Sequence, residues 1–143
     1  MTTGYQTYRK TQTHTADRSE LLLMLYDGAL RFTRRAIEAI EANDVTAKCE
    51  ALARAIAIIS ELHATLDPTV DEELTGNLAA LYLFCLDSYT QANAEGSTVP
   101  LKAVIPVLET LREGWGEAIH QVRAEGRSPQ AAPTRPTLSV VAG

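Results

Sequence analysis

A carboxylate and an imidazole at one helical spacing form the part of this chain that could hold a metal. Glu117 and His120 stand three positions apart. Di-iron bundles place this Glu-x-x-His spacing on two helices and add one Glu from each of the other two. Here the spacing occurs once, and the apolar helix stripes leave no matching inward carboxylates. We therefore expect a plain surface pair, with no metal site and no cofactor.

A lone histidine on a helix is also how phosphotransfer domains, themselves four-helix bundles, carry a phosphoryl group. His63 is the candidate, because His14 lies in a polar N-terminal stretch and His120 belongs to the surface pair. After His63 comes ATLDP, where such domains usually have a lysine and a glycine that let phosphate approach. A histidine at the edge of the core is therefore favoured, and phosphotransfer through His63 stays an alternative function.

The remaining reactive groups do not combine into a catalytic pattern. Cys49 and Cys85 lie far apart without a CxxC partner, which indicates reduced core thiols. The sequence has no glycine-rich phosphate loop, no nucleophile beside a base and no paired-carboxylate pattern. We expect that the protein is not an enzyme and has no catalytic residues, and that it works by binding another protein.

Charge and apolar content restrict the kind of partner. The 143 residues include 13 basic and 18 acidic side chains, and the net charge of -5 disfavours nucleic acid and anionic membranes. Apolar residues make up 45% and aromatic residues 6%, so the core should be mainly aliphatic. The longest apolar run, residues 21–26, is too short to span a bilayer, and the polar N-terminus lacks the apolar run of a signal peptide. We expect a globular, cytoplasmic protein without membrane insertion.

Apolar residues at helical spacing predict four helices that would position these groups. In the first helix the stripe consists of Leu22, Leu25, Ala29, Phe32, Ala36 and Ile40. Asp17 and Glu20 fit a capping box at the start of that helix, and Pro106 predicts a kink or a later start in the fourth. The predicted helices are about 17–42, 45–66, 71–94 and 99–126.

Short connections between these helices place neighbours antiparallel. We therefore predict an all-α protein, with an antiparallel up-down four-helix bundle in residues 17–126. Residues 1–16 are rich in Thr and Gln and should form a flexible N-terminal arm. Residues 127–143 are rich in Pro, Ala and Ser and should form a disordered C-terminal tail.

Two segments carry more apolar side chains than a bundle helix needs. Residues 21–26 are apolar all the way round, and residues 82–86 repeat the pattern. Each large apolar side chain left in water forgoes about 1.5–3 kcal/mol of burial, and a cluster of them normally marks an interaction surface. The surface is either a groove for a partner helix or extended chain, or a face covered by the arm or by a second copy, as in a structural dimerisation module.

The sequence resembles the family of bacterial flagellin export chaperones, FliS. The resemblance begins with Tyr8 in a polar arm and Thr15-Ala16, and its most specific part is LYDGA, residues 25–29. Later matches keep order and spacing at Leu62, Leu66-Asp67, Asn77-Leu78, Leu81-Tyr82, Ala92-Asn93, Leu111-Arg112 and Trp115. The chain departs from the family at Asp17-Arg18, where Ser-Pro is frequent, at Leu83-Phe84, where a more polar pair is usual, and at Pro106.

The resemblance implies a cytosolic bundle that binds the disordered C-terminal segment of flagellin. Binding would block premature polymerisation, and the complex would deliver flagellin to the flagellar type III export gate. The family's arm would lie over the binding surface when no flagellin is present. Other flagellar regulators are further candidate partners, and a homodimer stays open.

The expected contact residues follow from the surplus apolar surface and from this resemblance. Tyr8 is the expected displaceable cover, and Asp27 and Asn77 either bond to the client backbone or fix helix ends. Gly28 indicates close approach by a neighbouring helix or by the client. The expected apolar floor is Leu21, Met24, Leu25, Leu83 and Leu86, whereas Tyr26, Tyr82 and Trp115 are expected in the core.

Overall fold

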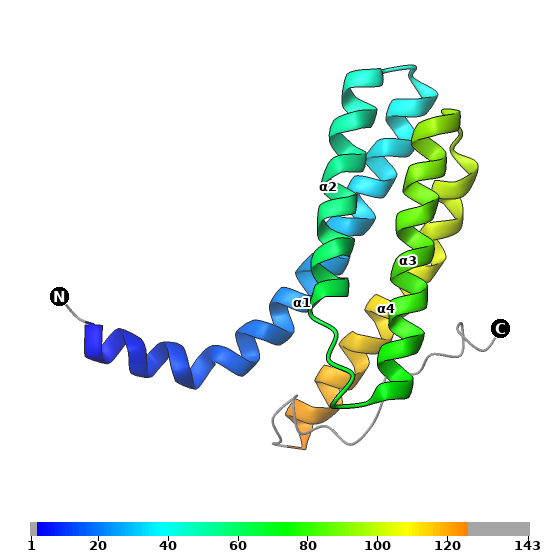
Figure 1. Cartoon of the computed structure of the whole chain (residues 1–143). Coiled ribbons are helices and arrows are strands. Elements are labelled where there is room, and N and C mark those ends of the chain that lie inside the picture. Colours follow the sequence, from blue (N-terminus) through cyan, green and yellow to red (C-terminus); the bar gives the residue numbers. More distant parts are fainter. Residues whose placement is uncertain (1–2, 126–143) are drawn as a thin grey trace.

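Four consecutive helices make up the part of the chain that the structure describes (Figure 1). The computed structural model describes the backbone of residues 3–125 and the side chains of residues 18–125. The helices are α1 (Thr3–Glu41), α2 (Val45–Ala64), α3 (Glu72–Glu95) and α4 (Val99–Ala124). The predicted all-α class is confirmed. Within the described residues, no helix is long and apolar enough to cross a membrane.

The first helix begins much earlier than the sequence indicated. α1 starts at Thr3, and the predicted start at Asp17 is wrong because the helix runs through that residue. From Tyr5 to Asp27 the sequence has no Gly or Pro, so nothing stops a helix from extending toward the N-terminus once it has formed. In Figure 1 this first part of α1 runs out beyond the other helices. The predicted tail, residues 127–143, lies outside the described residues.

Side chains and backbone at the helix ends explain where the other helices stop and start. Asp44 and Asp71 cap α2 and α3, and each carboxylate accepts a hydrogen bond of 3.0 Å from a backbone N–H three residues on. Gly96 ends α3 in the left-handed conformation that favours glycine, with φ 62°. Pro106 neither starts nor ends a helix, because α4 continues through it. Pro106 is exposed, so the carbonyl that loses its partner can face water.

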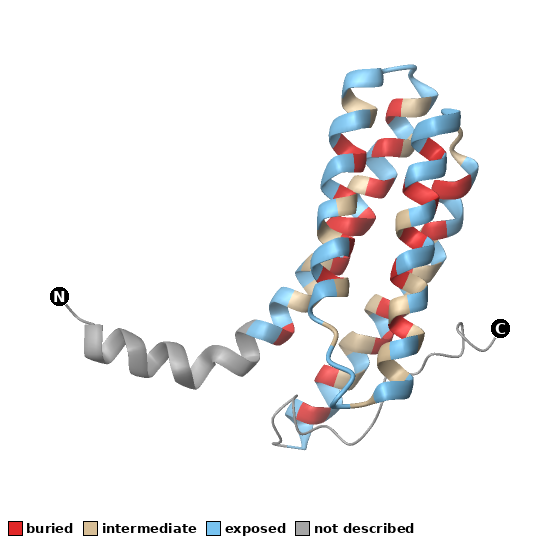
Figure 2. Cartoon of the chain, in the orientation of Figure 1, coloured by how far each residue is buried: buried red, intermediate tan, exposed pale blue. Residues whose placement is uncertain are grey.

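The helices pack in a ring. α1 and α3 each pack against α2 and α4, so α1 and α3 occupy opposite corners. The buried residues line the inner faces of all four helices (Figure 2). Two hydrogen-bonded pairs, Tyr26–Tyr82 and Thr33–Tyr89, step forward by seven residues on both α1 and α3. These two helices therefore run in the same direction, as an up-down-up-down bundle requires.

The centre of the core contains hydroxyl groups rather than aliphatic side chains alone. The Tyr26 and Tyr82 hydroxyls lie 2.5 Å apart, and the Trp115 indole N–H donates to the Tyr26 oxygen at 3.1 Å. Burial raises the pKa of Tyr82 to about 12 and shifts the pKa of Tyr26 and Tyr89 upward as well. The prediction that Tyr26 and Tyr82 belong to the core is confirmed, and Trp115 is half-buried against it.

Candidate partner-binding surface

The start of α1 leaves two large apolar side chains in water. Leu21 is 54% exposed and Met24 is 66% exposed, whereas Leu25 is half-buried against the core. Tyr26 is completely buried, and successive helix positions are about 100° apart. Met24, two residues earlier, therefore points away from the core. Two of the three residues predicted for this part of the apolar floor are exposed.

Gly28 lies where the Ile58 side chain of α2 packs against α1. It is buried, and a Cβ atom added there would lie 3.1 Å from the Cδ1 atom of Ile58. The missing side chain therefore lets the Ile58 side chain pack against the α1 backbone. The sequence predicted close approach by a neighbouring helix or by a client, and the structure places α2 in that role.

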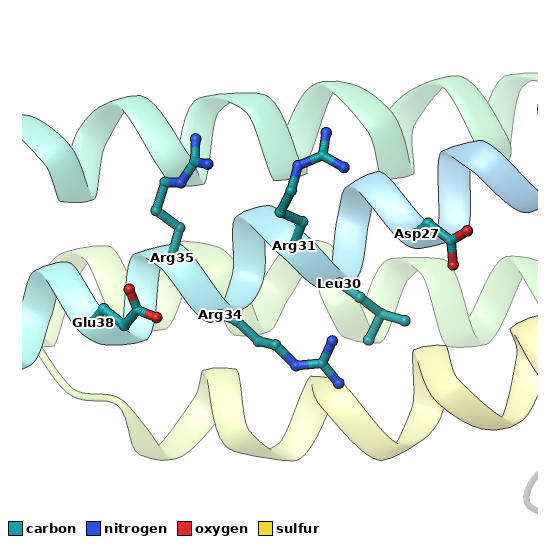
Figure 3. A pocket seen from close by; sticks show the side chains of 6 residues that line it. All are labelled: Asp27, Leu30, Arg31, Arg34, Arg35 and Glu38. Carbon is teal, nitrogen blue, oxygen red and sulfur yellow. The ribbon is translucent and has the colours of Figure 1, made fainter.

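Three arginines gather around one phenylalanine on the next two turns. The guanidinium carbons of Arg31, Arg35 and Arg54 lie 4.9, 5.3 and 5.7 Å from the centre of the Phe32 ring, within the range of cation–π attraction. Arg31 and Arg35 also line an open hollow of about 490 Å³ on the outside of α1. Figure 3 shows them pointing to the same side of the helix, while Arg34 points to the other. Sequence analysis missed this cluster, since Arg54 comes from α2.

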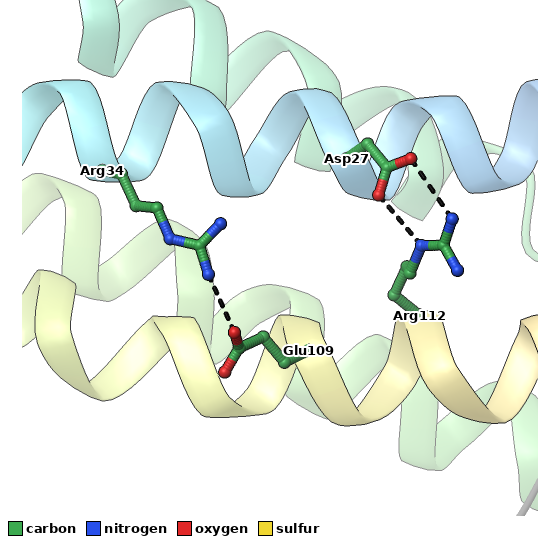
Figure 4. Close-up of polar contacts among 4 residues, drawn as sticks. All are labelled: Asp27, Arg34, Glu109 and Arg112. Atoms are coloured by element: carbon green, nitrogen blue, oxygen red, sulfur yellow. Dashed lines mark hydrogen bonds and ion pairs between the residues drawn. The ribbon is translucent and has the colours of Figure 1, made fainter.

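Two ion pairs join α1 to α4 (Figure 4). Arg112 binds both oxygens of Asp27, with its Nε 2.9 Å from Oδ1, and Arg34 donates to Glu109 at 2.8 Å. The hydrogen bonds that Arg112 donates to Asp27 raise the pKa of Arg112 above its usual value. Asp27 thus has a partner within the bundle, and its predicted contact with a client backbone stays a prediction.

The exposed residues of α3 form a separate patch. Leu83 is 50% exposed and Phe84 is 42% exposed, whereas Leu86 is half-buried against the core. Because α1 and α3 occupy opposite corners, outward side chains on the two helices face away from each other. We had expected Leu83 and Met24 to belong to one apolar floor. In the structure they lie on separate surfaces of the bundle.

The last two predicted contact residues are less informative. Asn77 is half-buried in the second turn of α3, beside the buried Leu78. Tyr8 lies on the first part of α1, but its side chain is outside the described residues. Its role as a cover stays a prediction.

The groups considered for chemistry lie apart from one another. His63 is half-buried near the end of α2, while Glu117 and His120 are exposed on α4. Among the residues with described side chains, no three His, Cys, Asp or Glu side chains are grouped so that they could hold a metal. Phosphotransfer through His63 stays a prediction.

The two cysteines differ in their surroundings. Cys85 is buried, and desolvation raises the pKa of its thiol to about 12. The prediction that Cys49 is a core thiol is wrong, because Cys49 is exposed. The buried stripe of α2 begins at Ala51 and Leu52, which leaves position 49 at its edge.

Three known proteins with sequences similar to this chain have the same name. Residues 1–122 match the family described as flagellar protein FliS. A flagellar secretion chaperone FliS from Bacillus subtilis is 36% identical over 121 residues, which cover 85% of this chain and 90% of the relative. The protein of the same name from Campylobacter jejuni is 34% identical over 114 residues, which cover 80% of this chain and 89% of the relative. The one from Salmonella typhimurium is 37% identical over 67% of this chain and 72% of its own.

Proposed function

This chain belongs to the FliS family of flagellar proteins, and from that membership we propose that it is a cytosolic chaperone for the C-terminal segment of flagellin. The family's named members are flagellar secretion chaperones, so a flagellar protein is the expected kind of partner. Covering the segment prevents premature polymerisation, and the complex delivers flagellin to the flagellar type III export apparatus. The export gate and other flagellar regulators are further proposed partners.

The observation that carries the proposal is the exposed apolar pair Leu21 and Met24 at the start of α1. A disordered segment loses chain entropy when it binds, so it needs apolar surface to offset that cost. Leu21 and Met24 are more than half exposed, and each would gain about 1–2 kcal/mol if its remaining exposed surface were covered. Ile58 of α2 packs against Gly28, one turn after Met24, and so continues this side of the bundle onto α2.

Calorimetry with a peptide from the cognate flagellin C-terminus tests this proposal. Met24→Asp should weaken binding at least tenfold, because a charge would be buried against an apolar client. Helical circular dichroism and the melting temperature should stay close to those of the wild type, since Met24 is exposed.

Val99→Asp provides the matched control. Val99 is 72% exposed, so it is also an exposed apolar residue, but it begins α4. Its position at a helix N-terminus favours a carboxylate. We expect this variant to bind like the wild type. Equal loss of affinity in both variants, or unfolding caused by Met24→Asp, would contradict the proposed surface.

The arm is proposed to cover the surface through Tyr8 until flagellin displaces it. In the same calorimetric experiment, a chain lacking residues 1–15 should bind the peptide as tightly as the full chain or more tightly. A large loss of affinity would mean instead that the arm contributes to the binding site. Light scattering on the free chain would show whether a second copy of the chain, rather than the arm, covers the surface.

A further inference from the structure

The arginine cluster around Phe32 is a concentration of positive charge in a chain whose net charge is -5. Arg31 and Arg35 lie one turn apart on α1, so like charges repel along the helix. Arg54 adds a third charge from α2, and all three guanidinium carbons lie within 5.7 Å of the same ring centre. Phe32 is itself half-buried against the core, so its ring holds the cluster in place.

These three arginines lack a close ion pair with a described carboxylate, although Asp27 and Glu38 line the same hollow as Arg31 and Arg35. No carboxylate with a described position lies within 4.0 Å of Arg31 or Arg35. Arg54 has only Glu50, at 3.9 Å, and both side chains are largely exposed. By contrast, Arg34 and Arg112 each have a carboxylate partner at 2.8 and 2.9 Å on the neighbouring helix. The chain therefore provides both satisfied and unsatisfied arginines on α1 and its neighbours.

We propose that Arg31, Arg35 and Arg54 bind carboxylates of an acidic segment in the protein partner. Guanidinium groups pair with carboxylates in two parallel hydrogen bonds, so three of them near one ring can hold several acidic side chains. We assign the cluster to a protein rather than to nucleic acid because the proposed function gives α1 a protein client.

The position of the cluster indicates what lies next to that acidic segment. Met24, Gly28, Arg31 and Arg35 follow one another at spacings of three or four, so they share one side of α1. A partner lying along this side would place apolar side chains on Met24 and acidic ones on the cluster. This assignment rests on the proposed function, because it takes the partner to be the client chain that binds to α1.

A labelled octaglutamate peptide tests the cluster without flagellin, by fluorescence anisotropy at low salt. The double variant Arg31→Gln and Arg35→Gln should weaken binding about tenfold, with a strong salt dependence in the wild type. The double variant Arg34→Gln and Arg112→Gln removes the same charge from arginines that already have partners. It should change octaglutamate affinity less than twofold.

Several results would overturn the assignment. Equal losses of octaglutamate affinity in the two double variants would mean that only the net charge matters. If a DNA duplex or anionic lipid vesicles bind more tightly than octaglutamate, the cluster would be a phosphate-binding site instead. Met24→Ala, which adds no charge, should keep octaglutamate affinity while it weakens binding of the flagellin peptide. Failure of the arginine cluster can therefore be distinguished from failure of the flagellin proposal.

Discussion

Neighbouring residues of α1 show how a small error in helix phase changes the prediction of individual side chains. The predicted stripe is confirmed at Ala29 and Ala36, which are fully buried, but its large members Leu25 and Phe32 are only half-buried. Tyr26 and Thr33, each one position later, lie at the centre of the core. Thr33 is polar, so an apolar pattern cannot find it. It is buried because its hydroxyl bonds to Tyr89 at 2.8 Å and to the Ala29 carbonyl at 2.7 Å. Such pairing across the bundle depends on three-dimensional contacts that the pattern does not contain.

Gly28 allows a residue-scale test of close packing. Gly→Ala within a helix usually gains about 1 kcal/mol in propensity. At Gly76, where an added Cβ atom would have nothing within 4 Å, we expect most of that gain in the free energy of unfolding. At Gly28 the Cβ atom would press on Ile58 Cδ1 at 3.1 Å, so we expect little or no gain.

Urea unfolding of Gly28→Ala, Gly76→Ala, Ile58→Val and the double variant Gly28→Ala with Ile58→Val would measure this difference. Ile58→Val removes the Cδ1 atom that the new Cβ atom would meet. The double variant should therefore be more stable than the sum of its single changes predicts. Equal gains at the two glycines would show that Ile58 moves aside without cost.

At the scale of elements, the sequence predicted the ends that have a local chemical signal and missed the end that has none. Asp44, Asp71 and Gly96 mark helix ends by capping or by a left-handed conformation. The observed start of α1 at Thr3 carries no such signal, whereas Asp17 and Glu20 fit a capping box that the helix runs through. The polar composition of residues 1–16 led us to predict a flexible arm. A polar stretch can nevertheless be helical when it continues a helix that packing has already formed.

The tyrosine contacts between α1 and α3 predict how the bundle responds to alkaline pH. Burial raises the pKa of Tyr82 from 10.0 to about 12 and that of Cys85 from 9.0 to about 12. The unfolded chain therefore releases these protons at lower pH than the folded chain. The free energy of unfolding should be steady up to about pH 8 and fall between pH 9 and 12 as the unfolded state ionises first.

Urea unfolding at several pH values from 7 to 11 would measure this fall. Tyr82→Phe removes one of the ionising groups, so its stability should depend less steeply on pH than that of the wild type, even if it is lower at neutral pH through the lost hydrogen bond. A wild-type stability that stays flat to pH 11 would mean that the buried groups ionise as easily in the folded chain.

At the scale of the whole molecule, the ring order of helices decides which exposed residues can act together. The sequence identified surplus apolar residues on the first and third helices, and Leu21, Met24, Leu83 and Phe84 are indeed exposed. The up-down topology that the sequence predicted places α1 and α3 at opposite corners, as the structure does. A single floor built from both helices therefore did not follow from the predicted fold. One predicted floor thus becomes two patches, with Leu25 and Leu86 packed against the core beside them.

Variants in the two patches distinguish two possible paths of the client across the bundle. If the client lies along α1 and α2 only, Leu83→Asp should leave affinity for the flagellin peptide within about twofold of the wild type, whereas Met24→Asp should remove binding. We expect this result, because a segment on the outer face of α1 cannot reach an outward side chain at the opposite corner. If the client wraps around the bundle as an extended chain, Leu83→Asp should also weaken binding severalfold, and shortening the peptide should restore equal affinity in that variant and the wild type. Calorimetry with a long and a short peptide on both variants separates a client held on one face from one that encircles the bundle.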